Sequence, residues 1–331
     1  MKKFMNDAGS LVADSLDGFV AAHDDLVAFG QGRKHVRRRF FSPGKVAVIA
    51  GGGAGHEPMH VGFIGSGMLD AACTGHVFTS PTPDQILGAI QEADTGAGVL
   101  LIVKNYDGDL MNFEMAAEMA VSAGSHRIET LVVSDDIAVE RTARGTGRRG
   151  VAGTLIVEKI VGAAAEAGHD LLSLKAVGES VIAVTRTMGV ALKGATVPQT
   201  TRETFVLGEN EMEVGVGIHG ERGRSRQEIA DAATIAALVC SQILNDLEPM
   251  PRQRILLFVN GLGGTPPSEL YVMFGLARRF FEAHGLVVAR KLVGTYATSL
   301  DMAGVSITVT LLDDASIALW DAPVYTAALH W

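Results

Sequence analysis

Short apolar runs recur along the first half of the chain, and each ends at glycines or at a cluster of polar residues. They span residues 45–50, 98–103 and 130–133. Runs of this length that are rich in β-branched residues are typical of strands buried on both faces. Helical patterns lie between and after them, at 85–93, 112–123, 151–166 and 171–184. Strands that alternate with helices predict a largely parallel sheet with helices on both faces.

The pattern restarts near residue 196 and predicts a second unit of the same class. Its expected strands are 211–218, 254–259, 286–291 and 306–312, and its expected helices are 227–245 and 268–284. The chain is therefore predicted to be an α/β protein of two domains, at 1–185 and 186–331. In each domain we expect a largely parallel or mixed sheet flanked by helices.

The composition favours a large core without cross-links. Apolar residues make up 47% of the 331 residues, which is enough for a core that needs neither disulfides nor metals. The two cysteines, Cys73 and Cys240, lie far apart and do not indicate a disulfide framework. The basic start of the chain is not followed by the apolar stretch of a secretory signal. We therefore expect a cytoplasmic protein.

Charge and hydropathy exclude two classes of partner. The apolar runs are well short of the roughly 20 residues that cross a membrane. The net charge of −9 argues against nucleic acid as a main partner. Residues 33–39 form a local basic cluster, which we interpret as a solvated loop before the first strand. The alternative is a docking point for an acidic partner or a phosphate.

The first candidate site is the glycine-rich turn at 51–56, directly after the strand at 45–50. Glycines there let the backbone approach a ligand closely, and ligands of open α/β sheets bind at the carboxyl ends of strands. Neither of the two glycine-rich nucleotide-binding motifs is present. Because His56 can titrate, the turn favours a small polar substrate and proton transfer. The alternative is a structural turn in which His56 caps a helix.

A second candidate site is the polar turn at 104–109, which follows the strand at 98–103. Lys104 can orient a substrate oxygen, and a carboxylate such as Asp109 can accept a hydroxyl proton. By itself this turn is more typical of solvated charges. Its place one strand away from the glycine turn favours a shared pocket.

The third candidate is His219, at the end of the alternating segment 211–218 and next to Gly220. An accessible neutral imidazole can act as a nucleophile towards a carbonyl group. A lone histidine is more often structural, so His219 depends on its context.

No metal site is predicted. Pro58 separates His56 from His60, although the two are four residues apart. The acidic pairs 135–136 and 313–314 have Mg²⁺-binding chemistry, but solvated turns are the favoured interpretation.

Together these segments resemble the dihydroxyacetone kinase family, specifically its substrate-binding K subunit. The resemblance runs almost end to end and rests on motifs at 51–60, 78–84, 104–109, 147–152, 210–213, 217–221, 296–302 and 319–323. So many separated motifs in one order make the signal specific.

The resemblance implies a covalent mode of binding. His219 is expected to bond to the ketone carbon as a hemiaminal, which selects short carbonyl compounds over polyols such as glycerol. The residues expected around the bound dihydroxyacetone are Gly53, Ala54, Gly55, His56, Lys104 and Asp109. His56 and Asp109 would handle the proton of the terminal hydroxyl, with Asp109 favoured as the base. Ala54 stands where serine is common in the family, which removes one possible hydroxyl contact.

The family also implies the phosphoryl donor. The sequence runs to Trp331, just after the last motif, and we expect no nucleotide-binding domain after it. We therefore expect a stand-alone bacterial subunit, a homodimer without a cofactor of its own. Its phosphate would come from a separate L subunit that carries Mg-ADP/ATP and is recharged by a phosphotransferase-system protein. The alternatives are a kinase subunit for another short ketose or aldose, such as erythrulose, and a non-catalytic ketone-sensing coactivator.

Overall fold

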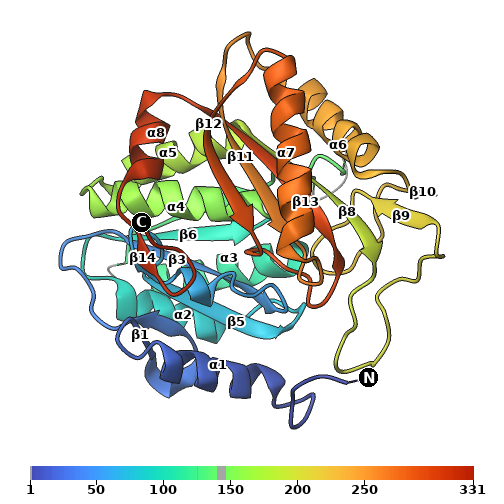
Figure 1. Ribbon diagram of the computed structural model, residues 1–331. Coiled ribbons are helices and arrows are strands. Elements are labelled where there is room, and N and C mark those ends of the chain that lie inside the picture. Colours follow the sequence, from blue (N-terminus) through green and yellow to red (C-terminus); the bar gives the residue numbers. More distant parts are fainter. Residues whose placement is uncertain (1, 125, 140–146) are drawn as a thin grey trace.

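The computed structural model describes residues 2–124, 126–139 and 147–331 and contains two six-stranded sheets (Figure 1). The first sheet has the order β1-β2-β5-β3-β6-β7. Its strands are β1 (Val27–Phe29), β2 (Val36–Arg38), β3 (Ala47–Ala54), β5 (Ala71–Val77), β6 (Val99–Lys104) and β7 (Ile128–Val133). The strands β5, β3, β6 and β7 are parallel, so their carboxyl ends meet at one edge of the sheet.

The second sheet is mixed and has the order β10-β9-β8-β13-β11-β12. Its strands are β8 (Thr185–Lys193), β9 (Glu211–Val214), β10 (Ser225–Glu228), β11 (Arg254–Gly261), β12 (Val287–Gly294) and β13 (Ala303–Leu312). Only β11 and β12 run parallel, and the other neighbours are antiparallel. A two-stranded sheet pairs β4 (Gly65–Ser66) with β14 (Tyr325–Thr326).

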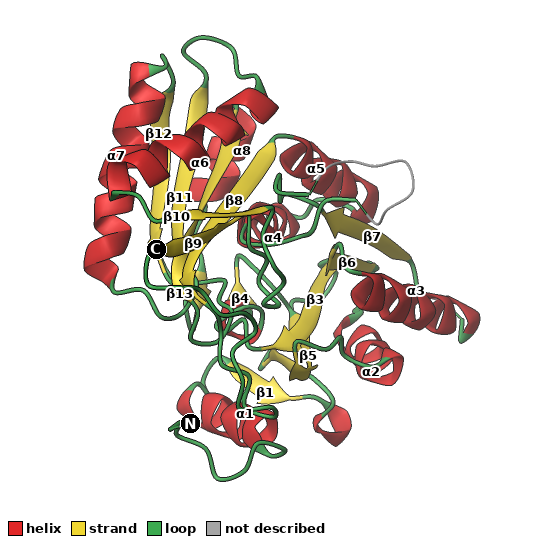
Figure 2. Cartoon of the chain, turned by 90° about the vertical axis from the view of Figure 1, so that its right-hand side faces the viewer, coloured by secondary structure: helices red, strands yellow, loops and turns green. Residues whose placement is uncertain are grey.

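The helices form layers around the two sheets (Figure 2). They are α1 (Leu11–Ala22), α2 (Pro83–Ala93), α3 (Asp107–Ser122), α4 (Gly153–Glu166), α5 (Leu171–Ala183), α6 (Ala232–Leu247), α7 (Pro267–Ala283) and α8 (Asp314–Asp321). Helices α2 and α3 cover the outer face of the first sheet, and α6 and α7 cover the outer face of the second. Helix α4 lies between the sheets and is buried from Gly153 to Ala165, as expected for a helix that is apolar nearly all round.

The C-terminal segment joins the two halves. Trp320, Val324 and Leu329 pack into the same core cluster as Val48 of β3 and Phe258 of β11. This cluster is therefore continuous across both sheets, and the proposed division at residue 185 stays a prediction. Within the described residues, no helix has the length and apolar character needed to span a membrane.

The predicted α/β class, with two sheets flanked by helices, is confirmed, and several local predictions are wrong. Gly51–Ala54 belong to β3 rather than to a turn, because their backbone pairs with β5. The segment after Asn105 is the start of α3, and the predicted strand at 211–218 ends at Val214. Residue 227 lies in β10, and α6 begins only at Ala232. Strands β5 and β8, with many alanine, glycine or threonine residues, escaped the apolar-run signal.

Two predictions of solvated charge are also wrong. In the basic cluster, Val36–Arg38 form β2. Arg38 is buried, and its charge is compensated by a hydrogen bond to Asp70 at 2.9 Å. Asp135 and Asp136 are buried as well. Asp135 accepts bonds from the backbone amides that start α4, and Asp136 pairs with Arg149 at 2.7 Å. The second acidic pair lies at the start of α8, where Asp313 caps the helix.

Candidate active site

The predicted glycine segment forms one wall of a buried site at the carboxyl end of β3. Gly53 and Ala54 end the strand, and Gly55 and His56 follow it, with Gly55 at φ +98°. A Cβ atom at Gly53 would lie 2.5 Å from the amide nitrogen of Thr79, so only glycine fits between β3 and the segment after β5. The backbone at the end of β3 thus packs directly against the backbone of the segment after β5.

The loop between β12 and β13 holds the segment after β3 in place. Leu300 donates its amide to the Gly55 carbonyl at 2.8 Å, and the Thr298 hydroxyl donates to the Glu57 carbonyl at 3.0 Å. Residues of the second sheet therefore fix the backbone of the first-sheet site.

His56 is fully buried and has one free ring nitrogen. Its Nδ1 lies 2.8 Å from the Thr298 carbonyl oxygen, which can only accept, so Nδ1 carries the proton. The other nitrogen, Nε2, is buried without a hydrogen-bond partner among the described residues. Burial, His219 and Lys104 hold the pKa of His56 well below its ordinary 6.5. His56 is thus a neutral imidazole whose Nε2 lone pair is available to accept a proton.

Lys104 and Asp109 come from neighbouring elements and form a buried pair. Lys104 is the last residue of β6, and Asp109 lies in the first turn of α3. The Lys104 Nζ atom is 3.5 Å from Asp109 Oδ2 and 3.2 Å from the Gly51 carbonyl oxygen. The exposed side-chain fractions are only 0% and 4%, so the alternative of a solvated turn is wrong.

His219 lies across from His56, on the loop between β9 and β10. The two ring centroids are 4.5 Å apart, with an interplanar angle of 83°. The His219 side chain is 15% exposed, so it lines the site while remaining reachable. The tertiary structure therefore supplies the context that a lone histidine lacks in the sequence.

Two residues that the sequence analysis did not select contact His219. Glu221 accepts a bond from the His219 amide at 2.9 Å, and its Oε1 lies 3.5 Å from His219 Nδ1. That distance is long for a directed hydrogen bond but close for a charge. Tyr106 lies on the other side of the imidazole, with ring centroids 4.2 Å apart. Tyr106 lies in the motif at 104–109 and Glu221 in the motif at 217–221, but only their contacts with the His219 ring indicate that they act on it.

The surroundings set the protonation of these neighbours. Burial works against the charge of Glu221, but contact with His219 and the charge of Arg149 outweigh it and lower the pKa below 4.5. Burial and the charge of Glu221 raise the pKa of Tyr106 well above 10. The Tyr106 hydroxyl keeps its proton and has no partner among the described residues. Glu221 is thus an anion beside Nδ1, which leaves Nε2 as the nucleophilic nitrogen of His219.

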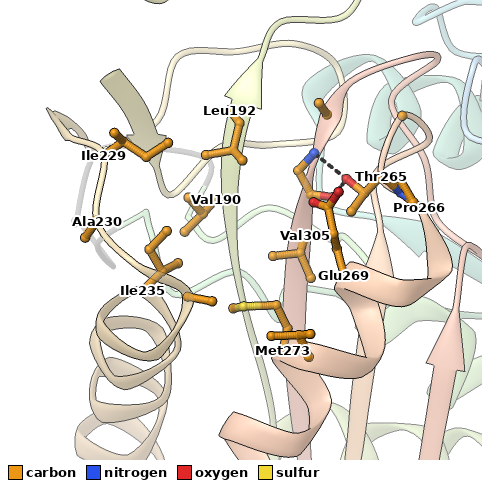
Figure 3. A pocket seen from close by; sticks show the side chains of 15 residues that line it. Val190, Leu192, Ile229, Ala230, Ile235, Thr265, Pro266, Glu269, Met273 and Val305 are labelled. Carbon is orange, nitrogen blue, oxygen red and sulfur yellow. Dashed lines mark hydrogen bonds between the residues drawn. The ribbon is translucent and has the colours of Figure 1, made fainter. Parts of the chain in front are cut away.

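An apolar cavity of ≈ 460 Å³ lies away from this site, between sheet two and the starts of α6 and α7 (Figure 3). Its walls are mainly aliphatic, and they include Val190, Ile235, Met273 and Val305. None of the predicted site residues lines it. Among the described residues, no group of three or more His, Cys, Asp or Glu side chains is placed to hold a metal ion.

Comparison with known proteins assigns the chain to a family. Residues 17–328 match the model of the Dak1 domain. The chain belongs to the Dak1 family. It is 48% identical to the PTS-dependent dihydroxyacetone kinase 1 dihydroxyacetone-binding subunit DhaK of Listeria innocua, over 99% of this chain and 100% of that protein. It is 41% identical to the corresponding PEP-dependent subunit of Escherichia coli, over 100% of this chain and 99% of that protein.

Solved structures agree with this assignment. The dihydroxyacetone kinase of C. freundii, in complex with AMP-PNP and Mg²⁺, matches with a TM-score of 0.89 and 36% identity. The match covers 98% of the Dak1 chain and 60% of that longer protein. The operon co-activator Dha-DhaQ matches with a TM-score of 0.90 and 33% identity, over 95% and 97% of the two chains. The resemblance to the dihydroxyacetone kinase family is confirmed.

Proposed function

We propose that this chain is the dihydroxyacetone-binding subunit of a phosphotransferase-system-linked dihydroxyacetone kinase. The single observation that carries the proposal is the contact between the rings of the buried His56 and of His219, whose centroids are 4.5 Å apart. Close to these rings, Lys104 and Asp109 supply a cation and an anion. The near-complete match to stand-alone DhaK subunits supports a separate phosphoryl donor.

The first step forms a covalent adduct. The lone pair of His219 Nε2 attacks the ketone carbon, a C–N bond forms, and the carbonyl π electrons move to the oxygen. That oxygen takes up a proton, and the imidazole ring loses the proton on Nδ1, beside Glu221, which gives a neutral hemiaminal. A polyol has no carbonyl carbon to attack, so glycerol gains nothing from His219.

The second step transfers phosphate to the terminal hydroxyl. The hydroxyl oxygen would attack the terminal phosphorus of the ATP on the partner subunit, the bond from that phosphorus to its bridging oxygen would break, and ADP would leave. A protein base takes the proton of the hydroxyl group. We assign that base to His56, although the family resemblance favours Asp109. His56 Nε2 is unpaired, whereas Asp109 is held by Lys104. The ketose is then bound and oriented by Gly53, Ala54, Gly55 and Lys104. Lys104 supplies positive charge near the ketose oxygens.

The proposal includes partners that this chain does not contain. They are an L subunit that carries Mg-ADP/ATP and a phosphotransferase-system protein that recharges it with phosphate from phosphoenolpyruvate. A second copy of this chain completes a homodimer, and the assembly works in the cytoplasm. All four elements stay predictions.

The deciding experiment is a coupled assay with an L subunit and its phosphoryl carrier. Dihydroxyacetone, glyceraldehyde, erythrulose and glycerol are supplied in turn, and phosphorylated product is measured. We expect transfer to dihydroxyacetone and none to glycerol. Transfer to none of the four would overturn the kinase function, and preferred transfer to erythrulose would change the substrate.

A substitution at His56 tests whether the chain acts as an enzyme rather than as a ketone sensor. His56→Gln removes the proposed base and leaves His219 in place. We expect the ketone adduct to persist in mass spectra while the turnover number falls by about 10²–10⁴-fold. An unchanged turnover number would remove His56 from the mechanism.

A further inference from the structure

A buried row of polar side chains runs from the active site into the helix between the two sheets. Lys104 Nζ lies 3.1 Å from His60 Nε2, and His60 Nδ1 lies 2.5 Å from Glu158 Oε1. Lys104 ends β6, His60 lies on the segment after β3, and Glu158 is on α4. All three side chains are at most 3% exposed. The reaction described above uses only Lys104.

The contacts determine where the protons lie. An ammonium group can only donate, so His60 Nε2 accepts from Lys104 and Nδ1 carries the ring proton. Nδ1–H then donates to Glu158 Oε1. This bond forms when Glu158 is ionised and also when it carries a proton on Oε2. Glu158 therefore fixes the His60 tautomer in both of its states.

Lys104 has two close acceptors and a third, more distant one. One ammonium proton points to His60 Nε2 at 3.1 Å, and a second points to the Gly51 carbonyl at 3.2 Å. The third points towards Asp109 Oδ2 at the longer distance of 3.5 Å. The two close contacts therefore aim the remaining proton at the site that holds Asp109.

Because Lys104, His60 and Glu158 are buried, their protonation and orientation depend on the contacts among them. Burial, Lys104 and His56 hold the pKa of His60 well below 6.5, so the ring remains a neutral acceptor. Burial raises the pKa of Glu158 well above 4.5. Buried polar groups are costly when unpaired, and a lysine side chain has many rotamers. Loss of the His60 acceptor would therefore allow the flexible Lys104 side chain to adopt another orientation.

We propose that His60 and Glu158 are positioning residues that aim the Lys104 ammonium group at the bound ketose. This inference deepens the proposed function and rests on it. The pair does not touch the substrate. It acts through Lys104, and a displacement of about 1 Å at such a group can cost about 10²-fold in rate.

The test compares two replacements of Glu158 that differ in one property. Glu158→Gln keeps an oxygen that accepts from His60 Nδ1–H, and Glu158→Met removes it at similar size. We expect Glu158→Gln to stay within about threefold of the wild-type turnover number and Glu158→Met to lose about 10–100-fold. The control is Thr154→Val, one turn earlier on α4 and equally buried, which should leave the turnover number unchanged.

A double-mutant cycle separates positioning from a general loss of structure. Lys104→Met removes the group that the pair is proposed to aim. If the pair acts through Lys104, Glu158→Met added to Lys104→Met causes no further loss. Additive losses, or a wild-type turnover number in Glu158→Met, would overturn the proposal. His60→Gln, which keeps an acceptor for Lys104, and His60→Asn, which is too short, give a second comparison if Glu158→Met does not fold.

A measurement without turnover keeps this inference distinct from the proposed function. Nitrogen-15 NMR of the histidine rings reports which nitrogen of His60 carries the proton. We expect the Nδ1–H form in the wild type and in Glu158→Gln, and its loss in Glu158→Met. The Nε2–H form in the wild type would refute the positioning pair. A chain with the expected tautomer that transfers no phosphate would refute the function instead.

Discussion

The imidazole rings of His56 and His219 lie edge to face, with centroids 4.5 Å apart, although they belong to different halves of the chain. His56 follows β3 of the first sheet, and His219 follows β9 of the second. The proposed base and the proposed nucleophile are therefore in contact at the junction of the two sheets. Packing of the sheets against each other brings this chemistry together.

Replacing the nucleophile should remove covalent binding. In His219→Ala we expect no ketone adduct in intact-protein mass spectra and a fall of about 100-fold or more in kcat/KM. Discrimination against glycerol should weaken because the carbonyl carbon is no longer attacked. His330→Ala, an exposed histidine near the C-terminus, is the control. Unchanged selectivity in His219→Ala would rule out the hemiaminal.

Removing the charge beside His219 should slow adduct formation. Glu221 remains a carboxylate at neutral pH, because its pKa lies below 4.5. In Glu221→Gln we expect adduct formation to slow roughly 10- to 100-fold, in line with the loss of a charged contact. The loss should be constant between about pH 6 and 8, since Glu221 does not titrate there. Stopped-flow ketone binding measures it, with exposed Glu228→Gln as the control; a loss that varies across this range would contradict the assignment.

The buried His56 and His60 should lower the free energy of unfolding as the pH falls below 6.5, whereas the raised pKa of Glu158 contributes in the opposite direction. His56 and His60 have folded-state pKa values well below 6.5, so the unfolded chain binds more protons in that range. Their contribution is present above the unfolded value and is lost as the pH falls towards the folded values. Each group contributes a slope of up to about 1.4 kcal/mol per pH unit. Urea unfolding between about pH 8 and 5 measures it.

The matched variants for this pH dependence are His60→Gln and His330→Gln. The first removes a buried histidine, so the slope below pH 6.5 should flatten. The second removes an exposed histidine, and the slope should remain as in the wild type. Equal slopes in the wild type and His60→Gln would mean that His60 does not titrate on unfolding as described.

A methyl group at Gly53 should close the site. The added Cβ atom of Gly53→Ala would lie 2.5 Å from the Thr79 amide nitrogen and 2.9 Å from backbone atoms of Phe78, so main chain must move. We expect weaker ketose binding by at least about tenfold and a lower melting temperature, as for overpacked sites. Gly18→Ala on α1, where the added Cβ atom would meet nothing within 4 Å beyond the adjacent backbone of its own helix, should instead be neutral or stabilising by up to about 1 kcal/mol. Normal ketose affinity in Gly53→Ala would show that the end of β3 does not contribute to ketose binding.

Much of the fold could be predicted because buried parallel strands have a strong local signature. The runs at 45–50, 98–103 and 130–133 correspond to β3, β6 and β7. Strand β8 was missed because it contains threonines and a glycine in place of a continuous apolar run. Its threonines can be buried because their hydroxyl groups bond to threonines of β13, as Thr187 does to Thr308 at 2.8 Å. Such pairing is invisible in one segment. The basic segment 33–39 was misread for the same reason, since Asp70 neutralises Arg38 only in the fold.

By itself, the sequence determined which residues could carry the chemistry. The motifs around His56, Lys104, Asp109 and His219 each consist of a reactive side chain beside glycine or at a strand end, and these are local properties. Only the tertiary structure decided how those side chains are used. It gives His56 its tautomer through Thr298, places Glu221 and Tyr106 against His219, and connects Lys104 through His60 to Glu158. Protonation and orientation depend on burial and on partners far away in the chain, and a linear pattern contains neither.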